Sequence, residues 1–184
     1  MIDAAHSSQA AASTENSGGL PLWCRIENLL PPVDCEGLFH EALAAADGFG
    51  PSRTLTSTSG HRRSSILFRN PPFLKDFVDV IRRCLPVATP ALGIVPFEPS
   101  RITAQVSAHH DGDYFHREPR AFKGGELVLY EYGTAHDHVE ASASVIVAPR
   151  GNTIVFFPSA APHEVRPVAC PSPRFEAGRF AIHG

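Results

Sequence analysis

The stretch GNTIVFFPS at residues 151–159, together with HEV at 163–165 and RFAI at 179–182, decides the fold. A Gly-Asn turn opens a continuous apolar run rich in β-branched and aromatic residues, which predicts a strand buried on both faces. A Pro-Ser corner follows this run, and His163 comes next. Arg179 begins a second apolar run, so we expect a neighbouring strand there. A histidine at one strand end and an arginine on the next strand can point into one cavity.

His163 and Arg179 carry the chemistry of this stretch. A histidine ring nitrogen can bind a metal, and the planar fork of a guanidinium can hold a carboxylate. A lone histidine at a strand end is otherwise a hydrogen-bonded structural residue. Arg179 lies among apolar residues, and a buried guanidinium requires an anionic partner. Arg174 is its rival, but it belongs to a Pro-Ser-Pro loop.

Helical periodicity occurs early in the chain and strand periodicity late. The patterns predict helices near residues 34–46 and 72–85, the second ending where prolines recur at 86 and 90. From residue 101 onward the chain consists of short β-prone runs divided by Gly, Pro and Asp, at 102–107, 126–131, 144–148, 153–157 and 179–182. This order predicts an α+β domain at residues 21–184, with the N-terminal helices packed on a β-sandwich or barrel. Residues 1–20, rich in Ala, Ser and Gly, are expected to form a flexible tail.

Bulk properties narrow the class of protein. A chain of 184 residues suits one domain, and 43% hydrophobic with 19% charged residues is an ordinary globular composition. The net charge of -3 argues against a nucleic acid or a membrane as partner. The four cysteines form no C-x-x-C pair, and residues 1–19 contain no apolar signal segment, so a cytoplasmic protein is expected.

The phrases FFPS, HEVRPV and RFAIHG, preceded by AQVSAHHDGDYF and FKGGEL, resemble the iron(II)- and 2-oxoglutarate-dependent dioxygenases. The likeness is to the bacterial branch related to prolyl 4-hydroxylases. It implies a double-stranded β-helix (a jelly-roll, cupin-like fold), in which His163 binds iron and Arg179 holds the far carboxylate of 2-oxoglutarate. His109 stands where the family has a tyrosine or histidine that contacts this co-substrate.

The resemblance also implies the partners. The expected cofactors are Fe(II) and the co-substrate 2-oxoglutarate, with ascorbate as a candidate further cofactor. The reaction would consume O2 and form succinate while it hydroxylates a prolyl or other amino-acid side chain, in a peptide or a small molecule. Nucleic acids and membranes are not expected as partners.

One part of the family pattern is missing. The family places an H-x-D motif and then a strand after a phrase like GDFF, whereas here GDYF at residues 112–115 runs directly into His116. Three interpretations stay open. His109 and Asp111 could supply the lost ligands, His116 and Glu118 could supply them as H-x-E, or the domain could lack a competent iron site. An unpaired sheet edge near residues 102–107, or a segment drawn in to cover it, is expected where the strand is lost.

Other functions remain as alternatives. A catalytically impaired relative could serve as a binding module on the same fold. A cupin-like metal or sugar binder would share the fold, but it needs two histidines and a glutamate in one early motif. The sequence His136-Asp137-His138 could suggest a metal cluster, yet it falls in a loop where solvated polar residues are the default.

Overall fold

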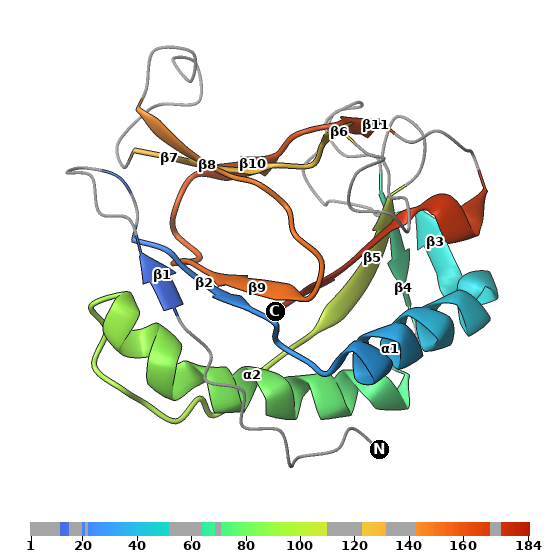
Figure 1. Cartoon of the computed structure of the whole chain (residues 1–184), viewed down its shortest axis with the longest axis horizontal. Helices are drawn as coiled ribbons and strands as arrows, with labels where there is room; N and C mark the ends of the chain where they lie inside the picture. The colour runs from blue at the N-terminus through green and yellow to red at the C-terminus, as the bar shows by residue number, and fades with distance from the viewer. Residues whose placement is uncertain are drawn as a thin grey trace.

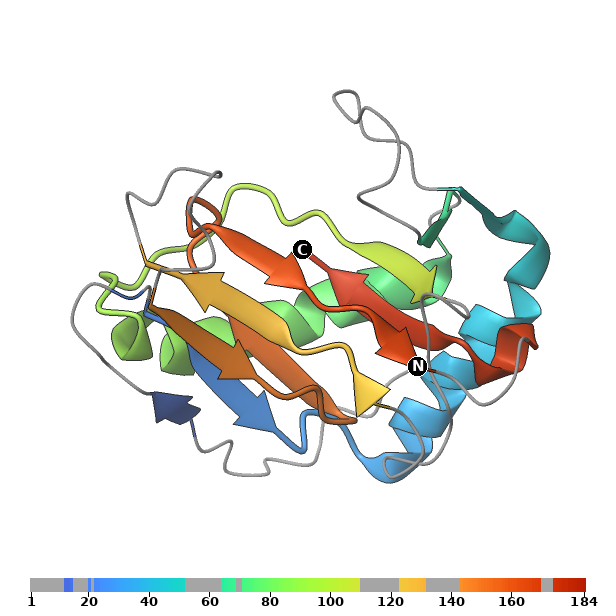
Figure 2. The same ribbon diagram turned by 90° about the horizontal axis from the view of Figure 1, so that it is seen from above.

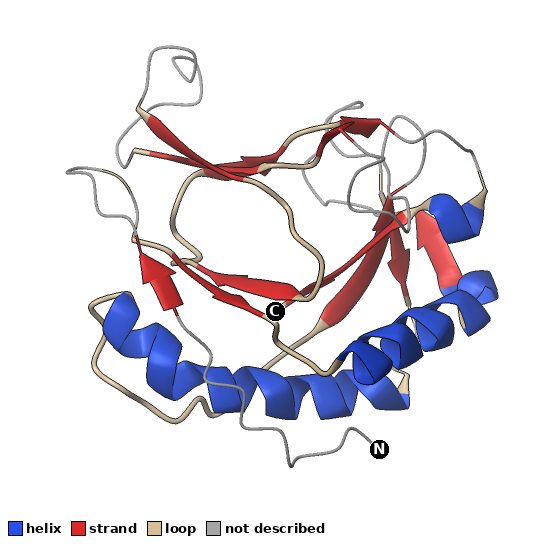
Figure 3. Ribbon diagram, viewed as in Figure 1, coloured by secondary structure: helices blue, strands red, loops and turns tan. Residues whose placement is uncertain are grey.

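The structure, a computed structural model, describes residues 12–14, 20, 22–51, 64–68, 71–109, 123–131, 143–169 and 174–184. It has two layers of antiparallel strands, with two long helices under the lower layer (Figures 1 and 3). The predicted α+β class, with the N-terminal helices packed on a sheet, is confirmed. Within the described chain, no helix is long and apolar enough to cross a membrane.

The lower layer consists of two antiparallel sheets. The first has the order β1-β2-β9, and the second has the order β12-β5-β4-β3. Their bounds are β1 Ala12–Thr14, β2 Cys24–Glu27, β9 Thr153–Phe156, β12 Arg179–His183, β5 Gln105–His109, β4 Ser65–Leu67 and β3 Phe49–Pro51. Strand β1 lies inside the predicted tail and pairs with β2, while most of residues 1–20 lie outside the described chain.

The upper layer covers the lower one, as the view from above shows (Figure 2). Its main sheet has the order β10-β7-β8, formed by β10 His163–Val165, β7 Leu127–Tyr130 and β8 Ser144–Val147. A two-stranded sheet of β11 Val168–Ala169 and β6 Lys123–Gly124 extends it. Trp23, the residue before β2, packs against Leu129 and Val147 and so joins the two layers.

The helices are α1 Pro32–Ala44 and α2 Pro72–Ala91, each with a proline in its first turn, where a missing backbone N–H costs nothing. The 3-10 turns η1 Ala46–Gly48 and η3 Phe175–Ala177 complete the helical elements of the described chain. The predicted end of the second helix at residue 85 was wrong, because α2 continues through Pro86 and Pro90. Each proline removes one backbone donor. Ala88 and Thr89, however, are only 1% and 3% exposed, so burial of this last turn outweighs the loss.

The main core lies between the lower layer and the helices. Side chains alternate along each strand, so one face packs on the helices and the other faces the upper layer. Two clusters fill the helix side. Their fully buried strand residues include Ile26 of β2 and Val106 of β5, while Ile182 of β12 packs against both clusters.

One sequence-based expectation about the strands was wrong. Strand β9 is half-buried rather than buried on both faces, because it pairs with β2 along one side only within the described chain. Of the two outcomes expected near residues 102–107, the unpaired edge is not found, since β5 pairs with both β12 and β4. The other outcome, a segment drawn in to cover the edge, stays a prediction. Strands β9 and β12 are edge strands of their sheets within the described chain, and both pack on the hydrophobic cluster around α2.

Asn152 connects the turn before β9 to the start of α1. Its side-chain Oδ1 accepts a bond from the Leu30 N–H at 2.8 Å, and its Nδ2 donates to the Leu30 carbonyl at 2.7 Å. The Leu29 N–H donates to the Asn152 carbonyl at 3.1 Å. Asn152 has a φ of 53°, a left-handed conformation that asparagine tolerates better than most residues. This contact joins segments that are distant in the sequence.

Substitutions at Asn152 separate the contribution of its side-chain hydrogen bonds from the contribution of its left-handed backbone conformation. Asn152→Ala should lower the free energy of unfolding by roughly 2–4 kcal/mol, because it removes two hydrogen bonds and adds left-handed strain. Asn152→Gly should cost about 1–2 kcal/mol, because only the bonds are lost. Urea denaturation measures both. Equal losses would show that the conformation contributes nothing, and no loss in either variant would contradict the contact.

Candidate functional site

The register of β12 against β5 brings two predicted site residues together. Arg179 lies directly opposite His109, and their side chains share one face of the sheet. Ala181 opposite Ser107 and His183 opposite Gln105 continue the same face. The intervening residues of both strands pack toward the helices, so this polar face is turned toward the upper layer.

Arg179 is held in a setting of low solvent access. The residue is half-buried and its Nε has no contact with solvent. Burial lowers the pKa of the Arg179 guanidinium from its ordinary value, because water no longer stabilises the charge. The next residue, Phe180, makes edge-to-face contacts with Phe39, Phe49 and Phe175 at centroid distances of 5.3–6.0 Å. These contacts fix the strand, so Arg179 is presented from a rigid element.

Ser107 connects two histidines on the same face. Its Oγ lies 3.1 Å from His109 Nε2 and 2.7 Å from His183 Nε2. The hydroxyl can also donate to the Ala181 carbonyl at 3.4 Å. Ser107 is 1% exposed, so this hydroxyl is shielded from water.

His163 lies in the upper layer, at the start of β10. It pairs with Leu129, which packs against Trp23 of the lower layer, so His163 shares the face turned toward the space between the layers. Its Nδ1 lies 2.8 Å from the Ala161 carbonyl, to which it donates in the neutral ring. Nε2 then carries the lone pair, and a backbone carbonyl on the other nitrogen is the usual support of a metal-binding histidine. The ring of Phe157 packs edge-on against it at 4.9 Å.

The expectation that His163 and Arg179 lie on neighbouring strands was wrong. They belong to separate sheets, β10-β7-β8 and β12-β5-β4-β3, in opposite layers. Strand pairing is set by tertiary packing rather than by order along the chain. Both side chains nevertheless lie on faces turned toward the interlayer space, and His163 is the more exposed of the two.

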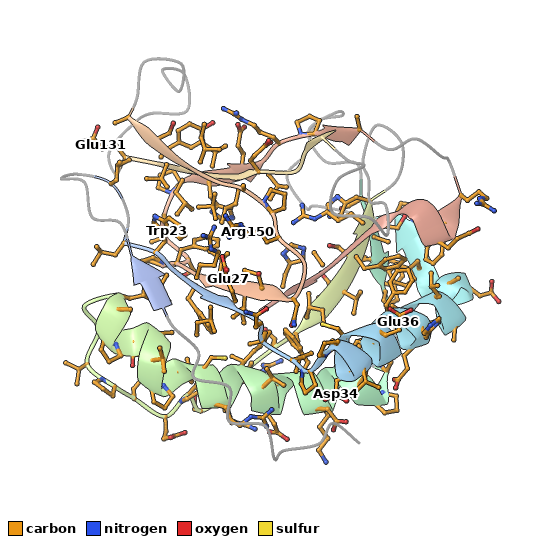
Figure 4. The ribbon with its side chains drawn as sticks, viewed as in Figure 1. Trp23, Glu27, Asp34, Glu36, Glu131 and Arg150 are labelled. Atoms are coloured by element: carbon orange, nitrogen blue, oxygen red, sulfur yellow. The ribbon has the colours of Figure 1, made fainter. Side chains whose placement is uncertain are left out.

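Charged residues at the β2 end of the interlayer space are paired with one another. Figure 4 shows Trp23, Glu27 and Arg150 in this space. Glu27 Oε1 accepts from an Arg150 terminal nitrogen at 2.7 Å and lies 3.0 Å from Arg25 Nε. Arg25 also lies over the Trp23 ring, 6.0 Å from its centroid. The two arginines therefore have a carboxylate of this chain as partner, which makes this end a poor site for an external anion.

The remaining candidates divide into two groups. Arg174 is exposed and lies 3.4 Å from Glu176, so it does not have the buried setting of Arg179. Asp111, His116, Glu118 and the sequence at 136–138 lie outside the described residues. Among the residues that the structure describes, no group of three or more His, Cys, Asp or Glu side chains could hold a metal ion.

The described cysteines do not form a metal site. Cys24, Cys35 and Cys84 are free, and burial raises the pKa of each thiol, which disfavours the thiolate that metals bind. Cys170 lies outside the described residues.

Ser107 and His183 were not connected with the candidate site by the sequence patterns, although both contact or adjoin His109 on its face of the sheet. The sequence contains a signal for Ser107: residues two apart on a strand share a face, so Ser107 is expected on the same face as His109. The contact between Ser107 and His183 depends on the register of two strands that are distant in the sequence, and no local pattern contains it.

The hydrogen bond at His163 predicts its neutral tautomer. Nitrogen-proton correlation NMR spectra, recorded while the ring of His163 is neutral, should show its proton on Nδ1. His40 on α1 is the matched control, because its Nε2 lies 3.2 Å from Glu36 Oε1 and should carry the proton. A neutral His163 with the proton on Nε2 would contradict the assignment and place its lone pair on the wrong nitrogen.

Comparison with known proteins identifies relatives. Residues 113–183 match the family described as the 2OG-Fe(II) oxygenase superfamily. An uncharacterized PKHD-type hydroxylase of Synechocystis sp. is 31% identical, over 86% of this chain and 61% of that protein. The chain therefore spans about three fifths of the length of this relative.

A solved structure also resembles the chain. It is a prolyl hydroxylase from Trichoplax adhaerens in complex with a peptide fragment of a hypoxia inducible factor oxygen degradation domain. The sequences are 18% identical, and the TM-score is 0.49 over 87% of this chain and 80% of that one. The family match and the PKHD-type relative agree with each other: residues 113–183 resemble the 2OG-Fe(II) oxygenase superfamily, and the chain is similar to a PKHD-type hydroxylase.

Proposed function

We propose that this chain is an Fe(II)- and 2-oxoglutarate-dependent hydroxylase whose site lies between the two strand layers. The observation that carries the proposal is the opposed pair of Arg179 and His109 on the interlayer face. A desolvated guanidinium is stabilised by an anion, and its planar fork matches a carboxylate in two-point contact. The two layers of antiparallel strands support a double-stranded β-helix, with the site inside it.

Each proposed residue has one task. Arg179 would bind the far carboxylate of 2-oxoglutarate and fix its orientation, while His109 would contact the co-substrate from the neighbouring strand. His163 would be one ligand of the iron through Nε2, with the Ala161 carbonyl holding its ring. The iron, when bound, supplies the activation of O2. The apolar residues around Trp23 and Leu129 limit water at the inner wall.

The geometry of His109 bears on the missing ligands. Its Nε2 faces the Ser107 hydroxyl at 3.1 Å, so a contact with the co-substrate or with iron would be made through Nδ1. The three interpretations therefore all stand: His109 with Asp111, His116 with Glu118 as H-x-E, or no complete ligand set. The substrate class, a prolyl or other amino-acid side chain, follows from the family resemblance alone.

A second candidate function is a binding module with impaired catalysis. The observation that favours it is the sequence GDYF at residues 112–115 running directly into His116, where the family has the H-x-D motif. Such a module would keep the Arg179 site and bind 2-oxoglutarate or a similar dicarboxylate without turnover. Binding and turnover therefore have to be measured separately.

Binding of 2-oxoglutarate should depend on Arg179. In anaerobic calorimetry with Fe(II) present, Arg179→Met should weaken binding on the order of a hundredfold, because a charge-assisted two-point contact is lost. Arg174→Met is the matched control, since Arg174 is exposed and should leave affinity unchanged. Equal effects of the two substitutions would contradict the assignment of Arg179.

Iron content should depend on His163. Protein loaded anaerobically with Fe(II) and desalted should retain less iron after His163→Ala than before it, whereas the exposed His40→Ala should retain as much as the wild type. Succinate formation that requires 2-oxoglutarate and His163 would establish the hydroxylase. Tight co-substrate binding without succinate would favour the binding module.

A further inference from the structure

We propose that Ser107 is a positioning residue of the co-substrate site, which acts by holding the imidazole of His109 beside Arg179. This inference rests on the proposed function, because it assigns His109 to 2-oxoglutarate. It adds two residues, Ser107 and His183, that the family pattern and the sequence do not assign to the site. The three polar side chains follow one another along a single face of the β5–β12 pair.

The placement of Ser107 explains why it can reach both rings. It lies at the middle of β5, opposite Ala181, whose small side chain leaves room on this face. His109 is two residues further along β5, and His183 is two residues beyond Ala181 on β12. The two imidazoles thus flank the serine, and their Nε2 atoms approach its Oγ at 3.1 and 2.7 Å.

Hydrogen-bond chemistry couples the three groups. A hydroxyl has one proton to donate and two lone pairs to accept with. If Ser107 donates to one Nε2, it can only accept from the other, so the two neutral rings carry their protons on different nitrogens. If the hydroxyl turns to the Ala181 carbonyl at 3.4 Å, it accepts from both rings instead. In either arrangement the Nε2 of His109 faces the serine, so the imidazole is held from this side.

Burial makes the arrangement stiff. Ser107 is 1% exposed, so water does not replace the bonds that the hydroxyl makes. The neighbouring residues of β5, Val106 and Ala108, are 1% and 0% exposed, which leaves the strand little freedom to move. The shorter contact is the one to His183, so His183 fixes the serine and the serine fixes His109. The expected gain is an imidazole already oriented before the ligand arrives.

A double-substitution cycle tests this assignment. Ser107→Ala should weaken 2-oxoglutarate binding roughly three- to tenfold in anaerobic calorimetry with Fe(II), the loss expected for one net hydrogen bond. In a His109→Ala background the same substitution should have almost no further effect, because the residue it acts through is gone. Ser107→Thr keeps the hydroxyl and should bind nearly as the wild type does. Ser144→Ala, at an exposed position on β8, is the matched control.

Other outcomes overturn the proposal. An equal loss in both backgrounds would mean that Ser107 acts independently of His109, as a purely structural residue would. An unchanged affinity of Ser107→Ala would also overturn it. Where Ser107→Ala does not fold, His183→Ala replaces it in the double-substitution cycle with His109→Ala, because His183 contacts Ser107. Its expected loss of 2-oxoglutarate affinity is smaller.

A second readout does not depend on the co-substrate. In the protein without ligand, Ser107→Ala should shift the ring-nitrogen NMR signals of both His109 and His183, while those of His40 stay unchanged. Unshifted signals would overturn the positioning role. Shifted signals in a protein that binds no 2-oxoglutarate would uphold the contact and reject the proposed function, so the two failures can be told apart.

Discussion

The antiparallel register of β5 and β12 is the constraint on which the site depends. Side chains alternate along a strand, so a shift by one residue would turn Arg179 toward the helices and Phe180 toward the upper layer. The apolar residues prevent this shift, because Val106 and Ile182 pack on the helices and Phe180 packs among aromatic rings. Hydrophobic burial on one face thus determines where the polar groups stand on the other.

The interlayer space has two ends with different electrostatics. At the β2 end, Glu27 pairs with both Arg25 and Arg150, so the cations there are neutralised by a carboxylate of the chain. At the β12 end, Arg179 lies opposite His109 in the strand register, and burial lowers the pKa of its guanidinium. This is the end at which the proposed dicarboxylate would bind. His163 approaches from the other layer, which places the proposed metal ligand and the proposed anion anchor on separate sheets.

Local sequence patterns predicted much of this fold and part of the site. Helical spacing of apolar residues indicated α1 and α2, and short apolar runs indicated β7, β8, β9 and β12 within a few residues. The end of α2 was missed because burial of Ala88 and Thr89 outweighs two prolines, and propensity alone cannot weigh tertiary packing. The strand of His163 was expected beside the strand of Arg179, but β10 pairs with β7. A strand of three residues carries too little sequence pattern to predict its pairing partner. Ser107 and His183 meet only once β5 and β12 are paired.

The separation of these elements has a consequence for the missing H-x-D motif. The anchor proposed for Arg179 and His109 is supported by the packing of β5 and β12 on the helices, through contacts between residues that the structure describes. The orientation of His163 depends on the Ala161 carbonyl and Phe157, which also lie elsewhere in the chain. In the proposed function, loss of two iron ligands would weaken metal binding, while the packing of β5 and β12 on the helices would still position Arg179. The proposed binding module would then lose turnover and keep dicarboxylate binding, because the proposed metal ligand and the proposed anion anchor lie on different sheets.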